Sequence, residues 1–385
     1  MIEKVLKKRN SSIELLKIFA IIMIVFSHAM AAWPAGDEYP YTVIQQGGQY
    51  IDIWSATDNI QIIVIMIMKY LGQLGNVIFV SCSAWFLVES KKLKIERIVN
   101  LILDNFFISV LFLVVFLFCG IKVHKILLIH SLLPFLFETN WFITCYVFLY
   151  ALHPILNIII NSLEEAKYKQ YLFVSICMYS FIALVLPGKL YSNDLVGFIL
   201  IYFIVGYLRK YKNDFVNNKE LHVKIIAFTS ILSIILFLGF DILGLRFSLL
   251  RNQMMRFCIF TNPLLIIIGI SLLCYFQTKE LKSPVINYMS SLSIYVYLIH
   301  CNDLVVKYLR YMYFDFIHMK YGMRLELLFV IVYGIATLAT SFLLGGGYKC
   351  TIARVTKSVS VRITQCLCKL PFFYKGELPH KLNYF

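Results

Sequence analysis

The chain carries too little charge for a soluble protein. Of its 385 residues only 15% are charged and 60% are hydrophobic, and the mean hydropathy is +0.77. Soluble domains are closer to ~25% charged and ~45–50% apolar. These values exclude a soluble domain. Apolar runs of about 20 residues recur along the chain, and they predict a helical protein that crosses a membrane several times.

The sequence also lacks a cysteine framework, an internal repeat and a low-complexity stretch. Most of its ten cysteines lie inside apolar runs, where cysteine behaves as a small hydrophobic residue. Cys366 and Cys368 form a C-x-C pair near the C-terminal end, but no second ligand pair accompanies them. The sequence therefore predicts neither a disulfide scaffold nor a metal site.

Acidic residues are scarce, with 21 Asp and Glu against 36 Lys and Arg, which gives a formal net charge of +15. The basic residues cluster in short segments between apolar runs. That placement is typical of membrane orientation signals and argues against nucleic-acid binding. The segments expected to face the cytoplasm hold most of these basic residues: 1–12, 89–97, 162–169, 211–222, 278–284 and the C-terminal tail. The bias predicts that both termini are cytoplasmic.

The apolar runs predict an all-α polytopic protein with about ten transmembrane helices. The expected spans are 13–33, 62–88, 98–120, 140–161, 170–187, 195–210, 223–241, 257–277, 285–306 and 325–345. Gly72 and Gly75 would permit a bend in the long second span. Segment 124–137 is expected to form a short re-entrant or interfacial helix. Residues 1–345 would form one membrane-embedded domain, followed by a basic cytoplasmic interfacial tail, 346–385.

The first expected span contains two ionisable residues, Lys17 and His28. Ionisable side chains are expensive in a membrane and are functional candidates by default. Eleven positions of α-helix place the two on the same face, about 16 Å apart along the axis. Glu14 falls on the same stripe. Signal-peptide cleavage after Ala31 would remove all three residues, but the length of the run favours an uncleaved span.

This order of an acidic residue, a basic residue three positions later and a histidine eleven positions after that resembles the acyltransferase-3 family of integral membrane acyltransferases. The family commonly shows Asp-x-x-Arg before the histidine, whereas here Glu14-Leu-Leu-Lys17 precedes His28. Lysine keeps the charge but loses the bidentate grip of arginine on phosphate. Three later segments also resemble the family: 77–87, with Ser83-Ala84 in place of Ser-Gly; 140–146, with Trp141 and Tyr146; and 293–300, which ends in His300.

The resemblance implies an enzyme of the bacterial inner membrane that moves an acetyl group from acetyl-CoA to a hydroxyl of a cell-surface saccharide or glycolipid. His28 would be the general base, a role that suits histidine because its pKa lies near neutrality. Lys17 would meet a phosphate or carboxylate of the donor, or else reach the lipid headgroups. Lys94 and Arg97 would contact the CoA phosphates, although topology alone also predicts a basic segment there. Glu14 would pair with Lys17 at i,i+3 and orient it.

Four further residues are candidates for supporting roles. The first and ninth expected spans run in the same direction, so His28 and His300 would lie at comparable depths and could share one cavity. A capping role for His300 at the interface is the alternative. Trp141 and Tyr146 would line an acceptor tunnel or belong to an aromatic belt. Ser83 stands in the place of the serine in the family's Ser-Gly pair.

The expected partners are acyl-CoA, a saccharide or lipid-linked glycan acceptor, and membrane lipids. No bound cofactor, metal or nucleic acid is expected. A polysaccharide or glycolipid transporter or export protein is the alternative function, although the inverted repeats and broken helices common in transporters are not evident in the sequence. A polysaccharide polymerase ranks below both.

Overall fold

The computed structural model describes residues 10–31, 59–90, 92–185, 193–247, 257–310, 312–313 and 326–369, and every regular element in these ranges is helical. The helices are α1 (Ser11–Ala31), α4 (Asn59–Leu87), α5 (Ile95–Phe118), α6 (Lys125–Leu132), α7 (Trp141–Ser162), α8 (Glu165–Ile176), α9 (Ala183–Val185), α10 (Asp194–Tyr211), α11 (Asn213–Asn217), α12 (Lys219–Arg246), α14 (Pro263–Gln277), α15 (Pro284–His300), α17 (Glu326–Cys350) and α18 (Ile352–Leu367). One π-helical turn, Cys177–Ile182, joins α8 to α9. A second, Val305–Arg310, follows α15.

Seven helices among the described residues are long and apolar enough to cross a membrane. They are Ser11–Ala29, Met66–Leu87, Ile95–Phe118, Trp141–Ser162, Glu165–Val185, Lys219–Gly244 and Leu328–Cys350. The other three expected spans correspond to α10, α14 and α15, which have 18, 15 and 17 residues. The chain is thus an all-helical, multi-pass membrane protein, and the count of ten spans stays a prediction.

Helix α14 begins later than the apolar pattern predicted. The expected span started at 257, whereas the helix starts at Pro263. Asn262 precedes it, and its Oδ1 accepts a hydrogen bond from the Leu264 N–H at 2.9 Å. A side-chain cap followed by proline at the first helical position fixes a helix start. Helix α15 begins in the same way, with a capping serine followed by proline.

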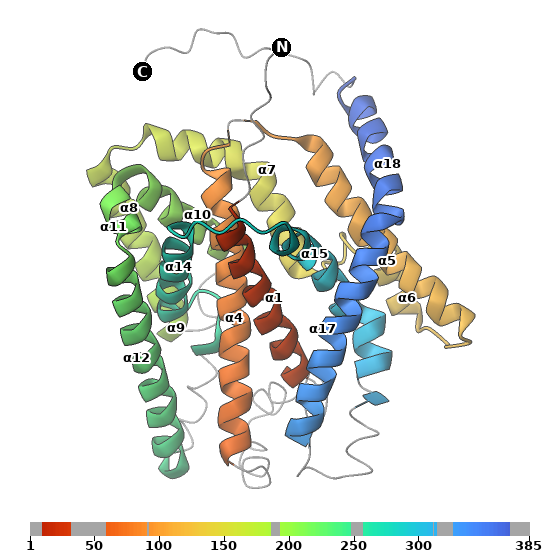
Figure 1. Cartoon of the computed structure of the whole chain (residues 1–385), viewed down its shortest axis with the longest axis horizontal. Coiled ribbons are helices and arrows are strands. Elements are labelled where there is room, and N and C mark those ends of the chain that lie inside the picture. The colour runs from red at the N-terminus through yellow and green to blue at the C-terminus, as the bar shows by residue number, and fades with distance from the viewer. Residues whose placement is uncertain are drawn as a thin grey trace.

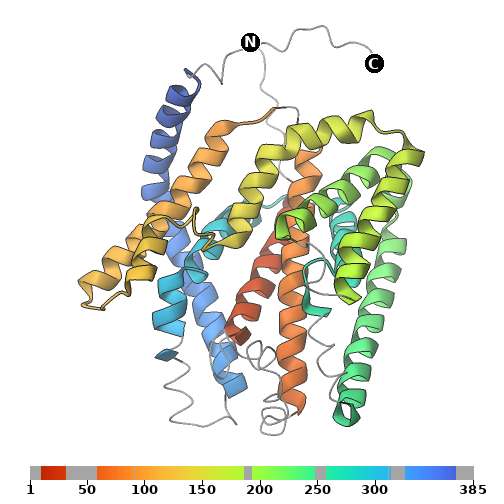
Figure 2. The ribbon, with the colours of Figure 1, turned by 180° about the vertical axis from the view of Figure 1, so that it is seen from behind.

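Helices α1 and α4 lie side by side in the centre of the molecule (Figure 1), with α12 on one flank and α5, α17 and α18 on the other, as the opposite view confirms (Figure 2). The glycines of α4 allow this approach. A Cβ at Gly72 would lie 2.2 Å from the Ser27 side chain, and one at Gly75 would lie 2.7 Å from the Ala20 carbonyl oxygen. Small residues are common at such membrane helix contacts. Helix α4 runs unbroken through both glycines, so they admit α1 and do not end the helix.

Buried polar contacts fix α7 against α4 and α10. The Asn157 side-chain amide donates to the carbonyl oxygens of Leu87 at 2.9 Å and Ser90 at 3.0 Å. The Tyr202 hydroxyl donates to Asn157 Oδ1 at 2.6 Å. The three partners lie in α4, in the turn after it and in α10. A buried amide with these partners restricts how the helices can slide, because any shift leaves polar groups unsatisfied.

Helix α7 also contains Pro154, which lacks the N–H that would donate to the carbonyl of Tyr150. The neighbouring His153 makes up for it, because its Nδ1 lies 2.5 Å from that carbonyl oxygen. The helix therefore continues through the proline to Ser162.

The C-terminal segment packs against the helices that precede it. Helix α17 is continuous through Cys350, so the domain boundary expected at 345–346 falls inside a helix. Helix α18 is amphipathic and packs against α5 (Figure 1). There the buried Asp104 accepts hydrogen bonds from the hydroxyls of Tyr348 and Thr356, both at 2.9 Å. A short helix, α6, lies where a re-entrant or interfacial helix was expected.

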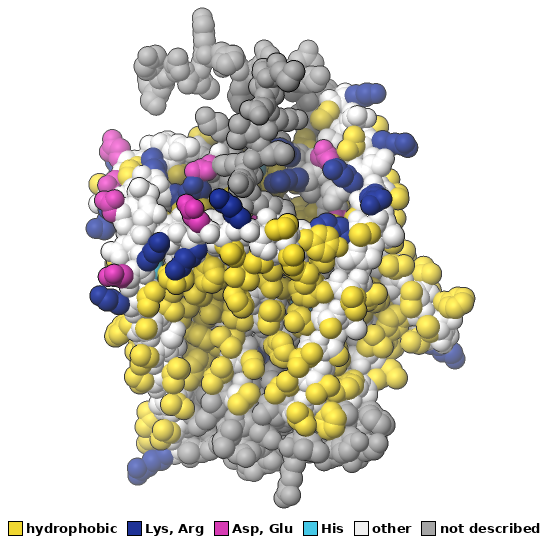
Figure 3. Space-filling model, viewed as in Figure 1, with side chains coloured by type: hydrophobic (Ala, Val, Ile, Leu, Met, Phe, Trp, Pro, Cys, Tyr) yellow, Lys and Arg dark blue, Asp and Glu magenta, His cyan; other side chains and the backbone are white. Residues whose placement is uncertain are grey.

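The surface divides into an apolar band and a charged end. Figure 3 shows hydrophobic side chains across the middle of one face, with Lys, Arg, Asp and Glu gathered toward the end where α18 finishes. A band of this kind is what a bilayer would surround.

Candidate active site

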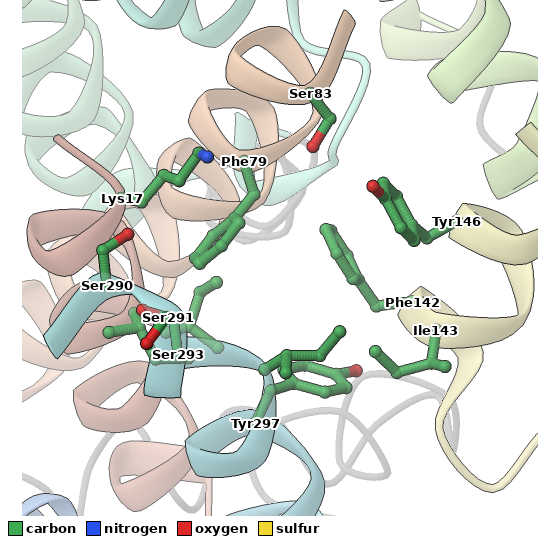
Figure 4. Close-up of a pocket in the computed structure, with 13 residues that line it drawn as sticks. Lys17, Phe79, Ser83, Phe142, Ile143, Tyr146, Ser290, Ser291, Ser293 and Tyr297 are labelled. Atoms are coloured by element: carbon green, nitrogen blue, oxygen red, sulfur yellow. The ribbon is translucent and has the colours of Figure 1, made fainter. Parts of the chain in front are cut away.

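Four helices, α1, α4, α7 and α15, surround a narrow cavity of about 160 Å³ (Figure 4). Lys17 and Ser83 lie toward one end of it and Tyr297 toward the other, with the rings of Phe79 and Phe142 between them. Most of the exposed wall is apolar. A space of this kind favours an uncharged chain, because a charged group would lose its hydration there.

A larger cavity of about 1020 Å³ adjoins the narrow one, and Lys17, Ser83 and Tyr146 line both. Its walls carry six basic side chains, Lys17, Lys94, Arg97, Lys349, Arg354 and Lys357, against three acidic ones, Glu14, Glu96 and Asp104. The basic side chains come from α1, α17, α18, the start of α5 and the residue before it. A concave surface with this excess of positive charge attracts anions, and Lys and Arg are the usual ligands of phosphate groups. We call this space the basic cavity.

Lys17 stands where the two cavities meet, and its position is set by an ion pair and a contact with an aromatic ring. Its Nζ lies 3.5 Å from Glu14 Oε2, one turn earlier in α1. The same Glu14 oxygen accepts a 2.5 Å hydrogen bond from the Ser290 hydroxyl on α15. Lys17 also lies over the Phe86 ring, 5.4 Å from its centroid. The carboxylate thus links α1 to α15 and holds the lysine at the mouth of the narrow cavity.

His28 and His300 meet at the other end of α1 and α15. His28 Nδ1 lies 3.0 Å from His300 Nε2, and Cys301 Sγ lies 3.3 Å from each of these nitrogens. His300 Nδ1 lies 2.6 Å from the Val296 carbonyl oxygen. A carbonyl can only accept, so Nδ1 of His300 carries a proton and a neutral His300 presents a lone pair at Nε2. His28 Nδ1 therefore donates, and His28 Nε2 retains a lone pair.

A third cavity, of about 190 Å³, touches His28 from the side of α4. It is lined by His28, Ser27, Lys69 and three further polar or small residues of α4, Gly72, Gln73 and Asn76. Ile24 of α1 borders both this cavity and the narrow one. The three cavities therefore follow α1, from the basic cavity past Lys17 to His28.

A family model described as an acyltransferase domain, that of the acyltransferase-3 family, matches residues 10–346. The chain belongs to the acyltransferase-3 family. No curated protein and no solved structure matches it. The protein is accordingly a transferase that uses an acyl donor, and all three cavities lie chiefly within the matched residues.

The acyltransferase brings most of the candidate residues together. Lys94 and Arg97 line the basic cavity, where Arg97 also lies over the Tyr150 ring at 6.0 Å. Ser83 and Tyr146 line both this cavity and the narrow one. Candidates from four helices thus face two cavities that share lining residues.

Trp141 is placed differently from the acceptor tunnel considered for it. Its indole packs edge-on against Phe142, Phe198 and Phe260, at centroid distances of 5.6, 6.3 and 6.5 Å. It lines none of the three cavities. This cluster joins α7 to α10, which makes Trp141 a packing residue.

Several residues of the candidate site were not singled out from the sequence. Lys349, Arg354 and Lys357 lie in the segment expected to be an interfacial tail, yet they line the basic cavity. Cys301 directly follows His300, and that adjacency was the available signal for it. Lys69, on α4, lies in an apolar run and was a detectable candidate for the same reason as Lys17.

The two histidines and Cys301 also form a group that could hold a metal ion, since one ligand atom from each lies within 4.8 Å of the others. The donor set of two imidazoles and a thiol suits zinc. The surroundings oppose a dication, because Lys69 lines the His28 cavity and Arg310 Nη1 donates to the His28 carbonyl oxygen at 3.1 Å.

Proposed function

We propose that the protein is an O-acyltransferase of the bacterial inner membrane that moves an acetyl group from acetyl-CoA to a hydroxyl of a cell-surface saccharide or glycolipid. His28 acts as the general base. The observation that carries the proposal is the line of cavities along α1, basic and wide at one end, apolar and narrow in the middle, with a histidine pair at the far end.

The basic cavity suits the nucleotide end of coenzyme A. Coenzyme A carries several phosphate charges at one end and an uncharged thiol arm at the other. Charge-assisted hydrogen bonds to phosphate are about twice as strong as neutral ones. Lys94 and Arg97 at the start of α5, with Arg354 and Lys357 on α18, surround this space from two sides. The uncharged arm can then enter the narrow cavity past Lys17, where a phosphate would be penalised.

The histidine pair suits removal of a proton from the acceptor hydroxyl. Val296 fixes the tautomer of His300, and His300 in turn fixes His28 with its lone pair at Nε2. This arrangement orients the base before the substrate arrives. Arg310 holds the backbone of His28 and contributes positive charge where an oxyanion would form. The acceptor hydroxyl would approach through the third cavity, which is bordered by polar groups of α4.

The test is transfer of labelled acetyl from acetyl-CoA to glycolipid in membranes of the native strain that carry either the wild-type protein or His28→Gln. Loss of a general base typically lowers kcat by ~10²–10⁴-fold, and we expect a loss in that range at equal protein level. His130→Gln is the matched control, because His130 pairs with Asp303 outside the three cavities at 3.1 Å. Full acetylation by His28→Gln would reject the assignment of His28 as the general base. Absence of transfer by the wild-type protein, with glycan export intact, would favour the transporter.

A further inference from the structure

Cys301 occupies an unusual position for a cysteine in a membrane domain. Among the described cysteines, Cys82, Cys258 and Cys274 are buried in the hydrophobic core. Cys301 instead is half-buried at the end of α15, and its Sγ lies 3.3 Å from an imidazole nitrogen of His28 and 3.3 Å from one of His300. A thiol at this distance from two imidazoles is the arrangement of an activated nucleophile.

The hydrogen-bond directions give the two histidines different roles toward this sulfur. His300 Nε2 carries a lone pair, because its Nδ1 proton is held by the Val296 carbonyl at 2.6 Å. This lone pair accepts from His28 Nδ1 at 3.0 Å, and it becomes free for the Cys301 thiol at 3.3 Å when His28 donates that proton to the sulfur instead. It can therefore take the thiol proton from Cys301. His28 Nδ1 carries a proton and can donate to the resulting thiolate. One imidazole removes the proton and the other stabilises the anion, which keeps His28 Nε2 for the acceptor hydroxyl.

Cys301 also lies between the donor and acceptor sides of the site. Tyr297, one turn earlier on α15, lines the narrow cavity, and its side chain interacts with that of Cys301. His28, in contact with the same sulfur, lines the cavity on the α4 side. The sulfur is therefore next to a residue of each space, at the point where an acyl group would pass from one to the other.

The surrounding charge favours an anion at this point. Arg310 donates to the His28 carbonyl oxygen at 3.1 Å, and Lys69 lines the adjoining cavity. Positive groups near a cysteine stabilise its thiolate, and they also stabilise the oxyanion that forms when a thioester is attacked. The same charges disfavour a dication. They therefore favour a nucleophilic cysteine over a zinc ligand as the role of Cys301.

We propose that Cys301 is a catalytic nucleophile that carries the acyl group as a thioester between donor and acceptor. This proposal rests on the proposed acyl-CoA donor. In the first step Cys301 Sγ bonds to the thioester carbonyl carbon, the bond from that carbon to the CoA sulfur breaks, and the thiol proton passes through His300 to the departing CoA thiolate. In the second step the acceptor oxygen bonds to the carbonyl carbon and its proton passes to His28. The Cys301 sulfur leaves and takes a proton from the imidazolium.

Such a relay removes a geometric demand on the site. The basic cavity and His28 lie at opposite ends of a stretch of α1 about 16 Å long. Direct transfer needs the whole donor and the acceptor hydroxyl to meet at one atom. A thioester on Cys301 lets CoA leave on its own side before the acceptor enters. No oxidant, reductant or energy source is needed, because one thioester replaces another.

The test is exchange of radioactive CoA into unlabelled acetyl-CoA by purified protein without acceptor, which requires reversible formation of an acyl-enzyme. The wild-type protein should catalyse exchange, and acid-quenched protein should carry acetyl on the Cys301 peptide, released by neutral hydroxylamine. Cys301→Ala should lose exchange by at least 100-fold, while Cys274→Ala, the matched control in the hydrophobic core, should keep it. A rise in the melting temperature of Cys301→Ala on addition of CoA would show that this variant is folded and still binds the donor.

The outcomes separate this proposal from the function on which it rests. Acetylation of the glycan without exchange, or at an undiminished rate in Cys301→Ala, overturns the nucleophile and leaves the acyltransferase reaction standing. Label on a histidine peptide overturns it as well. One zinc ion per protein, lost in Cys301→Ala while exchange continues, would make Cys301 a metal ligand. Absence of both transfer and exchange in the wild-type protein counts against the proposed donor.

Discussion

The contact that docks α18 onto α5 leads to a quantitative prediction. Thr356 Oγ1 on α18 and the Tyr348 hydroxyl on α17 both donate 2.9 Å hydrogen bonds to Oδ1 of the buried Asp104. A hydrogen bond to a charged group contributes about 1.5–3 kcal/mol. Thr356→Val keeps the shape of the side chain and removes one of these bonds. Since each 1.4 kcal/mol is a factor of ten, the undocked fraction of α18 should rise about 10- to 150-fold.

Limited proteolysis with trypsin measures this change, because Arg354, Lys357 and Arg362 are potential cleavage sites on α18. Cleavage of a transiently open segment follows the equilibrium population of the open state when closing is fast. We therefore expect cleavage within α18 to be about tenfold faster or more in Thr356→Val. Asp104→Ala removes the common acceptor and should also raise KM for acyl-CoA, because two cations leave the basic cavity with the helix.

The control for this experiment is Thr364→Val, the same substitution on the same helix. The Thr364 hydroxyl makes no hydrogen bond to the residues that the structure describes. Its removal should leave cleavage at the wild-type rate. Equal rates for wild type, Thr364→Val and Thr356→Val would refute the idea that the Asp104 contact holds α18 in place.

Three further substitutions test the packing and the donor site. Gly72→Ala should lower stability by about 1–3 kcal/mol in thermal unfolding, because its Cβ would lie 2.2 Å from the Ser27 side chain. Gly239→Ala is the control and should leave stability unchanged, because its Cβ would have no atom within 4 Å. Asn157→Leu should cost about 1–3 kcal/mol for each buried partner left unsatisfied, seen as a lower Tm and a lower yield of folded protein. Arg97→Gln should raise KM for acyl-CoA about tenfold or more with little change in kcat, since it removes charge from the binding cavity alone; an unchanged KM would place the donor elsewhere.

The fold was predictable where the signal is local in sequence. A run of about 20 apolar residues predicts a span by itself, and seven helices of this kind occur in the part of the chain that the structure describes. The start of α14 needed the cap at Asn262, which periodicity alone passes over. The glycines of α4 were interpreted as a possible bend, because their use depends on a neighbour. Only the position of Ser27 and Ala20 on α1 shows that Gly72 and Gly75 admit another helix.

The site was predictable within one helix and less so between helices. Lys17 and His28 share a face of α1 by periodicity alone, and Glu14 pairs with Lys17 at i,i+3. The contact of His28 with Cys301 joins residues 273 apart. Asp104 stands alone in an apolar run, and its partners on the C-terminal segment are 244 and 252 residues away. An amphipathic pattern predicts that α18 has an apolar face, but that face could cover a membrane or another helix.

For the proposed acyl-CoA donor, the order of charge along α1 would explain how one site can hold a highly charged molecule and still react in an apolar interior. Phosphate charge is favoured where six cations line a wide cavity, and it is excluded where the narrow cavity is walled by Phe79 and Phe142. An uncharged arm meets no such penalty. Lys17 marks the boundary, since it is the last cation before the apolar stretch. In this proposal the phosphate charge of the donor stays in the basic cavity, and only the acyl group has to reach the histidine pair.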